Sequence, residues 1–313
     1  MPKVSIIIPA YNHANLISQT IDSVLNQTFT DYEIIVINDG SPDKTEEVLQ
    51  PYIRQNLIIY KKQKNMGQSH ARNIGLTIAK GEYIALLDDD DIWPQDKLEW
   101  QTRFLDENPN TGMVVGTCET IEETPKKYTT TESYSILSFE SLLIQNPIIS
   151  PGQTLARRDT LAKTGGFSPE IWGADDWDMY LKISKISTIV LSPKLGLHYR
   201  VHANNASKRL IPMLNNTIRV FEKHITSVPK ERQTKTARLA YRWFYTFSIK
   251  PRTSLLKHLI RRGNTILSIK TTIEILNLLA ALILNRNFLT WCILRRTKTE
   301  LNSSTGITST TPK

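Results

Sequence analysis

Four consecutive aspartates, Asp88 to Asp91, have the clearest capacity for chemistry in this sequence. They follow the apolar run Tyr83–Leu87, and adjacent like charges cost about 1 kcal/mol in water and roughly 4 kcal/mol at a partly buried position. A solvated acidic turn is the simplest alternative. The run favours a compensating cation instead, because carboxylate oxygens suit Mg²⁺ or Mn²⁺ completed by substrate phosphates. An EF-hand is excluded, since Ile92 and Trp93 stand where that loop needs a ligand and a glycine.

A second carboxylate, Asp39, follows the apolar run Glu33–Ile37. Its ordinary role would be that of a turn residue. Because Ser41, followed by Pro42, is suited to cap the next helix, we expect Asp39 to remain available to a ligand donor such as a nucleobase imide N–H. Arg72 opens a later helical segment, where it can pair with a phosphate or equally bridge to a carboxylate.

A third acidic cluster, Asp175 and Asp176, directly precedes a helix predicted near Trp177–Ser187. Carboxylates at a helix start are favoured by its free N–H groups, so capping and general-base catalysis both remain open. Further along, His198 and His202 lie near the end of the acidic part of the chain. A lone histidine is more often structural than a ligand.

Several large enzyme classes are disfavoured by the motifs that are missing. The sequence has no G-x-G-x-x-G, P-loop, G-x-S-x-G or H-E-x-x-H pattern, which argues against dinucleotide oxidoreductases, P-loop nucleotidases, serine hydrolases and zincin proteases. Its two cysteines, Cys118 and Cys292, form neither a disulfide framework nor a metal pair. Carboxylates are therefore the groups left to perform chemistry.

The elements that must position these residues alternate in type. Val- and Ile-rich runs predict strands, and the segments between them have helical spacing. The expected strands are 4–8, 33–37, 57–60 and 83–87, and the expected helices are 14–26, 43–54 and 67–80. This rhythm predicts a parallel sheet covered by helices on both faces, with ligands beyond the carboxyl ends of the strands. The polar clusters 9–12, 38–41 and 88–91 all fall there.

Beyond these elements, further strands are predicted at 113–118, 147–155 and 188–191, with a polar loop over 120–135. The start of the chain is read as a strand, because its apolar run is too short for a signal sequence. From residue 209 the pattern becomes helical. Residues 207–313 hold 20 basic and 4 acidic residues, a net charge of +16, whereas the first 206 carry 19 and 26, a net charge of −7. We therefore expect a catalytic domain over 1–206, a basic helical region over 207–300, and a disordered tail over 301–313.

Taken in order, these segments resemble glycosyltransferase family two, whose members have the GT-A fold. The resemblance covers roughly residues 3–205, about two thirds of the chain. It is carried by the segments 4–12, 36–41, 65–73, 81–97, 165–167, 175–178 and 199–202. It implies an α/β GT-A fold with a Rossmann-like, mostly parallel sheet, followed here by the basic α-helical C-terminal region.

The resemblance also implies roles for individual residues. The family's D-x-D motif maps onto Asp88 and Asp90, with Asp89 at a position where a small residue is common. Asp176 matches the general base, and Asp175 replaces the more frequent Glu. The metal would be held by Asp90, Asp88 and His202. The donor-binding residues would be Pro9, Tyr11, Asn12, Asp39, Asn65, Gly67, Arg72, Asp88 and Asp89, and the acceptor would be met by Phe167 and Trp177.

By the same resemblance, the expected activity is metal-dependent, inverting transfer of a sugar from a UDP- or dTDP-linked donor to a hydroxyl of a glycan or lipid-linked acceptor in cell-surface polysaccharide synthesis. The cofactor would be Mg²⁺ or Mn²⁺. The expected location is cytoplasmic and peripheral at the inner face of the membrane, since 271–294 resembles an interfacial element flanked by basic residues. Packing of this helical region on the catalytic body remains the alternative.

Two other functions stay open. A nucleotidyltransferase also uses paired carboxylates, but the segment Pro9–Asn12 is not a Gly-rich, Lys/Arg-bearing loop. A non-catalytic nucleic-acid binder could use the basic region with Trp243 and Tyr245, but no known binding motif appears. Nucleic acid is therefore not the expected partner.

Overall fold

The computed structural model describes residues 1–121, 125–202, 205–244, 272 and 276 of the 313-residue chain. The chain divides into two compact units. The first comprises Met1–Leu142 and Asn146–Lys208, and the second comprises Leu143–Gln145 and Arg209–Lys313.

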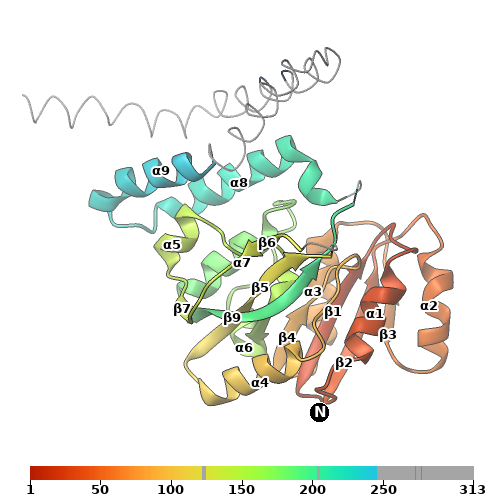
Figure 1. Cartoon of the computed structure of the whole chain (residues 1–313). Coiled ribbons are helices and arrows are strands. Elements are labelled where there is room, and N and C mark those ends of the chain that lie inside the picture. Colours follow the sequence, from red (N-terminus) through yellow and green to blue (C-terminus); the bar gives the residue numbers. More distant parts are fainter. Residues whose placement is uncertain (122–124, 203–204, 245–271, 273–275, 277–313) are drawn as a thin grey trace, which may run out of the picture. The chain divides into compact units, whose positions relative to one another are not determined.

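Nine strands of the described chain form one mixed sheet in the first unit (Figure 1). They are β1 (Val4–Ala10), β2 (Tyr32–Asn38), β3 (Ile59–Lys62), β4 (Tyr83–Leu86), β5 (Thr111–Thr120), β6 (Lys127–Thr129), β7 (Ser135–Ile136), β8 (Thr154–Arg157) and β9 (Thr188–Tyr199). Their order is β3-β2-β1-β4-β8-β5-β9-β7, with β6 paired to β5. The strands β3, β2, β1 and β4 are mutually parallel, and β8 is antiparallel to both of its neighbours. Four carboxyl ends therefore meet at one edge of the sheet.

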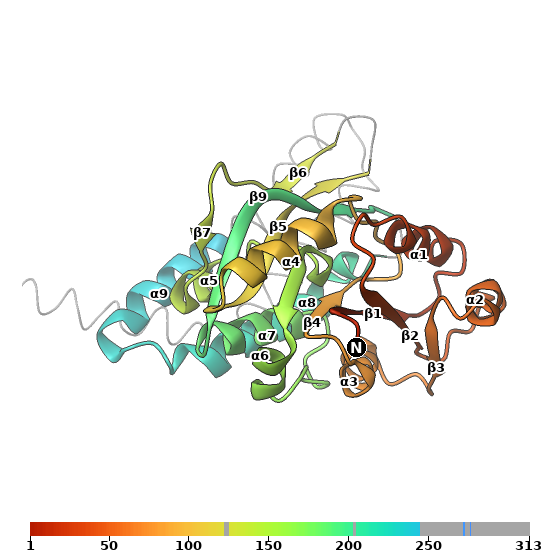
Figure 2. The ribbon, with the colours of Figure 1, turned by 90° about the horizontal axis from the view of Figure 1, so that it is seen from below.

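Helices cover both faces of this sheet. The helices that lie between the strands along the chain are α1 (Ile17–Leu25), α2 (Thr45–Arg54), α3 (Gln68–Ile78), α4 (Lys97–Glu107), α5 (Phe139–Ile144), α6 (Arg158–Lys163) and α7 (Asp175–Ser184). Figure 2 shows α1 and α4 on one face and α3, α6 and α7 on the other. Side chains alternate along β1, so Ile6 and Ile8 join the core beneath α1, whereas Ile7 faces α3. There a Cβ on Gly75 would lie 2.3 Å from Ile7 Cγ2, so glycine permits this close helix–sheet contact.

The expected alternation of strands and helices is confirmed through β4. Each predicted element appears within a few residues of its expected bounds, and the sheet is parallel in this half. The helices α4, α5 and α6 were not predicted. Their amphipathic patterns are short or interrupted by charged residues, and tertiary packing decides them.

One prediction that proves wrong concerns the start of α2. Ser41 does not cap it, because the helix begins at Thr45 and its N-cap residue, Lys44, makes no side-chain cap bond. Instead Asp43 Oδ1 accepts from the Thr45 backbone N–H (3.1 Å) and hydroxyl (2.6 Å). The Ser41 hydroxyl accepts from the Asn12 N–H at 3.1 Å. The turn after β2 therefore delays the helix and ties Ser41 to the loop after β1.

Two later segments also differ from prediction. The polar stretch 120–135 contains β6 and the first residue of β7, both on the periphery of the sheet, where exposed positions accept polar side chains. The apolar stretch 147–155 becomes a strand only at Thr154 and is preceded by a short 3₁₀ turn, η1 (Pro151–Gln153). The hydroxyl of Ser150 caps this turn by accepting from the Gly152 N–H at 3.2 Å.

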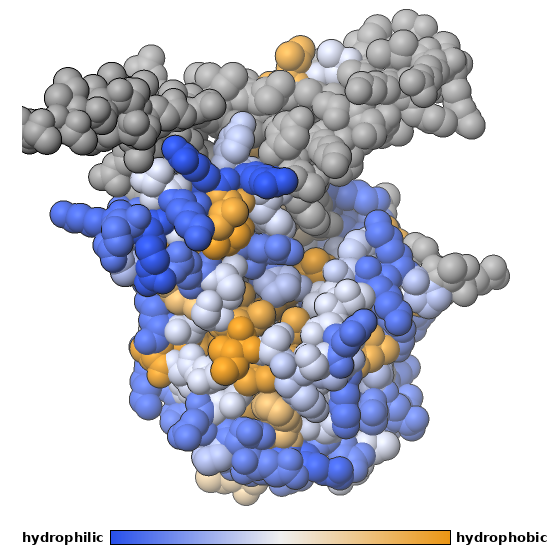
Figure 3. Space-filling model, turned by 60° about the vertical axis from the view of Figure 1, so that its left-hand side comes forward, coloured by the Kyte–Doolittle hydropathy of each residue, from blue (hydrophilic) through white to orange (hydrophobic). Residues whose placement is uncertain are grey.

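The surface of the first unit is mostly hydrophilic, but an apolar area interrupts it on the side that carries β7 in Figure 1 (Figure 3). Ile136 in β7 is 70% exposed. This edge strand has only two residues, which limits its capacity to pair with another strand.

The described part of the second unit carries α8 (Leu210–Ile225) and α9 (Lys230–Phe244). Buried residues recur at helical spacing in α8: Leu214, Ile218, Phe221 and Ile225. Among the described residues, no helix is both long and apolar enough to cross a membrane. The expectations for 271–294, for the remainder of the basic region and for the tail 301–313 fall outside the described residues, apart from Thr272 and Leu276.

Candidate active site

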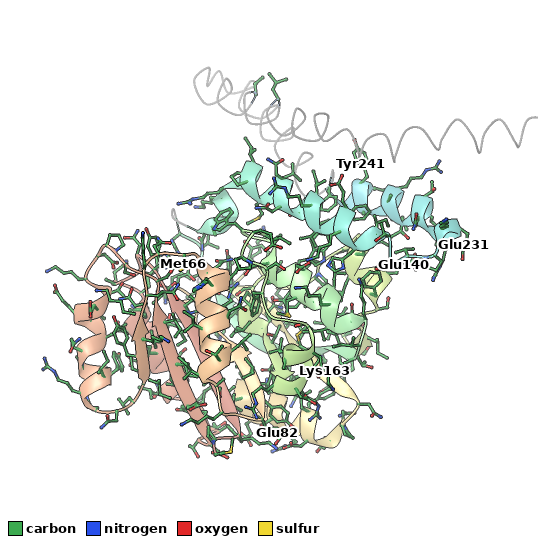
Figure 4. All side chains as sticks on the ribbon, turned by 180° about the vertical axis from the view of Figure 1, so that it is seen from behind. Met66, Glu82, Glu140, Lys163, Glu231 and Tyr241 are labelled. Atoms are coloured by element: carbon green, nitrogen blue, oxygen red, sulfur yellow. The ribbon has the colours of Figure 1, made fainter. Side chains whose placement is uncertain are left out.

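The expected site lies where the parallel strands end. Ala10 of β1 is opposite Asn38 of β2, and Ile7 is opposite Leu86 of β4, so the loops that follow these strands start side by side. Figure 4 shows Met66, in the loop before α3, at this end of the sheet, and Glu82, which precedes β4, at the other end. The sheet therefore gathers the three polar clusters that the sequence places after its strands.

A buried arginine links two of the acidic clusters. Arg72, on α3, is 2% exposed and donates from NH1 to Asp175 Oδ2 (2.8 Å) and from NH2 to Asp88 Oδ1 (2.7 Å). Burial opposes its charge, but the attraction of Asp88 and Asp175 outweighs burial and raises the pKa of Arg72. Of the two roles considered for Arg72, the structure shows the bridge between carboxylates. Its buried Nε has no hydrogen-bond partner among the described residues.

The candidate base, Asp176, lies in the first turn of α7, beside this network. Its Oδ1 accepts from the backbone N–H of Trp177 at 2.7 Å. Burial, followed by the negative charge of Asp175, raises the pKa of Asp176 to about 7, although Arg72 acts in the opposite direction. Asp175 itself is held by Arg72 and by the Gln68 amide (2.8 Å). The two adjacent carboxylates thus differ: Asp175 is paired with Arg72, whereas Asp176 has a pKa raised toward neutral pH.

The four aspartates after β4 have different partners. Asp88 Oδ1 faces Arg72, and its Oδ2 is met at 3.4 Å by the Ser150 hydroxyl. Asp91 is fully buried, accepts from the Arg200 backbone N–H (3.0 Å) and the Ser150 hydroxyl (3.2 Å), and has a pKa raised well above the usual range by burial. Asp91 is therefore a structural anchor for the end of β9, a role that the sequence did not disclose.

Asp89 joins the loops after β1 and β4. Its Oδ2 accepts from the Tyr11 N–H at 2.8 Å, and its Oδ1 lies 2.7 Å from Nδ1 of His13. This hydrogen bond, opposed by burial, raises the pKa of His13 to about 9. Arg72 thus places positive charge beside Asp88, and His13 gives Asp89 a hydrogen-bond partner.

Asp90 and His202 are brought together from 112 positions apart. His202 Nε2 lies 2.9 Å from Asp90 Oδ2. With His13 they form a group whose potential ligand atoms all lie within 4.8 Å of one another. This donor set fits a divalent cation in its chemistry, because imidazole nitrogens and a carboxylate oxygen are common metal ligands. Asp88, the other expected ligand, is not in this group. His13 was not identified from the sequence, where its only signal is its position directly after Tyr11–Asn12.

The carboxylate of Asp39, predicted to be available to a ligand donor, is engaged within the protein. It is 4% exposed and accepts three hydrogen bonds from the loop before α3: from Gln63 Nε2 (2.6 Å), the Met66 N–H (2.8 Å) and the Gly67 N–H (2.9 Å). Ser41 does not cap α2, so the prediction that this cap leaves Asp39 available is wrong in its premise. Asp39 holds the loop that contains Asn65 and Gly67 against the end of β2.

The remaining donor-side residues surround this loop. Pro9 is buried within β1 opposite Ile37, whereas Tyr11 is 43% exposed. Asn12 and Gly67 both have positive φ, 60° and 90°. A Cβ on Gly40 would lie 2.8 Å from the Asn65 nitrogen, so glycine is needed where the two loops approach. The expected donor residues therefore lie in adjoining loops.

The two residues expected to meet the acceptor are interior. Phe167 and Trp177 are each 3% exposed. The Phe167 backbone exchanges two hydrogen bonds with the Asn73 side chain (2.8 and 2.9 Å), and its ring centroid lies 5.5 Å from Arg72 Cζ. The Trp177 indole N–H donates to the Leu142 carbonyl at 2.8 Å. In this conformation both side chains support the site from within.

The sequence of this chain is similar to those of known glycosyltransferases. The family model described as Glycosyl transferase family 2 matches residues 5–165. An uncharacterized glycosyltransferase of Rickettsia prowazekii is 30% identical over 240 residues, which is 74% of each chain. A chondroitin synthase of Pasteurella multocida is 32% identical over 208 residues, covering 66% of this chain and 21% of that protein. Another Rickettsia relative, from R. bellii, is 47% identical over 106 residues, and the match spans 34% of this chain and 15% of that protein.

Solved structures share the fold. The crystal structure of S. aureus TarS 1–349 in complex with UDP-GlcNAc aligns with a TM-score of 0.70 at 19% identity, over 94% of this chain and 82% of that one. The mannosyltransferase PcManGT from Pyrobaculum calidifontis, in complex with GDP-Man and Mn²⁺, aligns with a TM-score of 0.60 at 20% identity, over 90% of this chain and 86% of that one. The expected GT-A fold is therefore confirmed.

Proposed function

This chain belongs to glycosyltransferase family 2 and is a nucleotide-sugar-dependent glycosyltransferase, and from that premise we propose that it transfers a sugar with inversion from a UDP- or dTDP-linked donor to a hydroxyl of a glycan or lipid-linked acceptor. Cell-surface polysaccharide synthesis is the proposed setting. The chondroitin synthase relative is consistent with it.

The observation that carries the proposal is the contrast between Asp175 and Asp176. Asp175 is buried against Arg72 at 2.8 Å, whereas burial and Asp175 raise the pKa of Asp176 to about 7. A general base works best when its pKa lies near the operating pH. Asp176 is accordingly the proposed base, and Asp175 holds its surroundings.

The donor would lie across the loops after β1, β2 and β4. Pro9, Tyr11, Asn12 and Asp39 are the proposed neighbours of the base and ribose, with Asn65 and Gly67 in the loop that Asp39 holds. Arg72, Asp88 and Asp89 are the proposed neighbours of the diphosphate side. The adjoining of these loops supports the proposed positions, and Asp39 would act there partly by fixing the loop before α3.

The proposed ligands of Mg²⁺ or Mn²⁺ are Asp90, Asp88 and His202. Asp90 and His202 are already 2.9 Å apart, and Asp88 Oδ2 has only the long contact to Ser150 at 3.4 Å among the described residues. A divalent cation bound there supplies positive charge to the leaving nucleoside diphosphate.

On the acceptor side, Asp176 removes the proton from the acceptor hydroxyl as its oxygen attacks the anomeric carbon, and the bond to the diphosphate breaks on the opposite face. Inversion follows from this single displacement. Arg72 donates hydrogen bonds to both Asp88 and Asp175, so it fixes the distance between the segment proposed to meet the sugar donor and the helix that carries the proposed base. Phe167 and Trp177 are proposed to shape the acceptor side from beneath.

A panel of nucleotide sugars tests this function. The full chain is incubated with each UDP-, dTDP- and GDP-sugar in the presence of Mn²⁺ or Mg²⁺, and released nucleoside diphosphate is measured. We expect metal-dependent release from one UDP- or dTDP-sugar, and its loss in Asp176→Asn. Release that is independent of metal, or that persists in the variant, would contradict the proposal.

The basic region is the proposed contact with an anionic membrane surface. Five basic residues of α9 are exposed: Lys230, Arg232, Lys235, Arg238 and Arg242. Each basic residue near an anionic surface contributes about 1 kcal/mol. Flotation with neutral vesicles and with vesicles rich in phosphatidylserine tests this contact, and equal binding to both would exclude an electrostatic one.

A further inference from the structure

The side chain of His13 is fixed in one orientation by Asp89. Its Nδ1 lies 2.7 Å from Asp89 Oδ1, and Asp89 is itself held by the Tyr11 backbone N–H at 2.8 Å on Oδ2. Both contacts join the loop after β1 to the segment after β4. The contact with Asp89 occupies Nδ1 of His13 and leaves Nε2 as the imidazole nitrogen that can bind a metal ion.

His202 faces the same place from the segment that follows β9. Its ring lies 5.2 Å from that of His13, centroid to centroid, with the two planes at 84°. Its Nε2 is 2.9 Å from Asp90 Oδ2. The potential ligand atoms of His13, Asp90 and His202 all lie within 4.8 Å of one another. Two imidazoles and one carboxylate therefore converge from three separate segments of the chain.

The contacts of His13 have the form that metal-binding histidines commonly take. Such a histidine usually donates its second ring N–H to a carboxylate, which fixes the tautomer and the ring orientation. Asp89 is positioned to perform this role for His13. By contrast, Asp88 Oδ1 is engaged by Arg72 at 2.7 Å, so Asp88 can meet the cation only through Oδ2.

The two imidazoles in this group bear on whether the site binds Mg²⁺ or Mn²⁺. Carboxylate and water oxygens suit both cations, but Mg²⁺ demands near-ideal octahedral oxygen coordination, whereas Mn²⁺, as a transition metal, also accepts imidazole nitrogen. We propose that His13 is a ligand of the catalytic cation, with Asp89 as its positioning residue, and that the two imidazoles make the site select Mn²⁺ over Mg²⁺. This inference rests on the proposed metal-dependent function and adds a ligand and a selectivity to it.

Pulsed electron paramagnetic resonance of bound Mn²⁺ counts the imidazole ligands directly. The full chain, with ¹⁵N-labelled histidine, is loaded with Mn²⁺ and UDP, and the nitrogen modulation of the electron spin echo is recorded. We expect two coupled histidine nitrogens in the wild type and one in His13→Gln. The matched control is His198→Gln, whose imidazole pairs with Glu119 at 3.5 Å outside the group and should leave two.

Affinities measured by calorimetry complete the test. We expect His13→Gln to weaken Mn²⁺ binding by roughly 10- to 100-fold and Mg²⁺ binding by less than about threefold, so that selectivity collapses. Asp89→Asn should weaken Mn²⁺ binding by a smaller factor while both nitrogens remain coupled. The wild-type spectrum alone decides the ligand count if a variant does not fold.

The outcomes separate this inference from the function on which it rests. One coupled nitrogen in the wild type, or unchanged Mn²⁺ affinity in a folded His13→Gln, would overturn His13 as a ligand while metal-dependent donor cleavage still stood. Equal wild-type affinity for Mn²⁺ and Mg²⁺ would overturn the selectivity. Mn²⁺ that does not bind in the presence of UDP would overturn the metal-dependent function itself.

Discussion

The guanidinium of Arg72 and the carboxylate of Asp175 form an ion pair at 2.8 Å, and both side chains are at most 2% exposed. The residues are 103 positions apart, on α3 and α7. Because Arg72 also bonds Asp88, this pair connects the segment proposed to meet the diphosphate with the helix that carries the proposed base.

Replacing this arginine should destabilise the protein strongly. Arg72→Met leaves Asp175 buried without its cation, and removing one partner of a buried pair costs about 3 to 5 kcal/mol. Urea unfolding measures the loss. The control is Arg103→Met, whose exposed pair with Glu99 at 3.2 Å should contribute under about 1 kcal/mol. An Arg72→Met loss no larger than that of the control would show that the buried pair contributes little.

Asp176→Asn should abolish transfer with little effect on donor binding. General-base catalysis is worth about 100- to 10,000-fold, so turnover should fall by that factor while the dissociation constant for UDP stays within about threefold. Asp159→Asn removes a carboxylate with 71% side-chain exposure on α6 and should retain wild-type turnover. If donor affinity falls together with turnover, the assignment of Asp176 as the base fails.

The raised pKa of Asp176 predicts a pH-dependent stability difference. Its folded-state pKa of about 7 exceeds the ordinary value of 3.8, so between these values the folded protein binds more protons than the unfolded chain. Stability is therefore lost as pH rises through this window. Asp176→Asn should be more stable than the wild type by about 1 to 3 kcal/mol at pH 8 and equal to it near pH 3. A constant difference in unfolding free energy across that range would contradict the raised pKa.

Removing the metal or its proposed carboxylate ligand should remove metal-dependent donor affinity. With EDTA, calorimetry of the wild type should show weakened UDP binding that Mn²⁺ restores, whereas Asp90→Ala should stay weak after Mn²⁺ is added, because Asp90 supplies an anionic ligand. Asp96→Ala, at the N-cap of α4 without a side-chain cap bond, is the control. Full restoration of Asp90→Ala by Mn²⁺ would exclude Asp90 as a ligand.

Asp39→Ala should loosen the loop before α3. The change removes the carboxylate that accepts three hydrogen bonds, donated by Gln63, Met66 and Gly67, and each bond to a charged acceptor is worth about 1 kcal/mol or more. We expect faster amide exchange at Met66 and Gly67 and weaker binding of uridine as well as UDP. Weakened binding of UDP alone would place Asp39 on the diphosphate side instead.

Part of this protein is determined locally by its sequence. Apolar runs such as Tyr83–Leu87, separated by helical patterns, predict the strands, the parallel half of the sheet and the edge where Asp39 and Asp88–Asp91 gather. These predictions hold because strand and helix periodicity is a property of neighbouring residues, and because parallel strands bring their carboxyl ends to one edge. The order of these motifs also identifies the family.

Only the tertiary structure decides which side chain each group meets. The sequence left Arg72 between phosphate and carboxylate, predicted that Asp39 is available to a ligand donor, and gave no role to His13 or Asp91. In the structure Arg72 joins Asp88 to Asp175, Asp39 holds a loop, Asp91 anchors Arg200, and His13 meets the group that contains His202. Buried polar atoms must find partners wherever the register and packing of distant segments supply them, and that constraint has no local periodicity in the sequence.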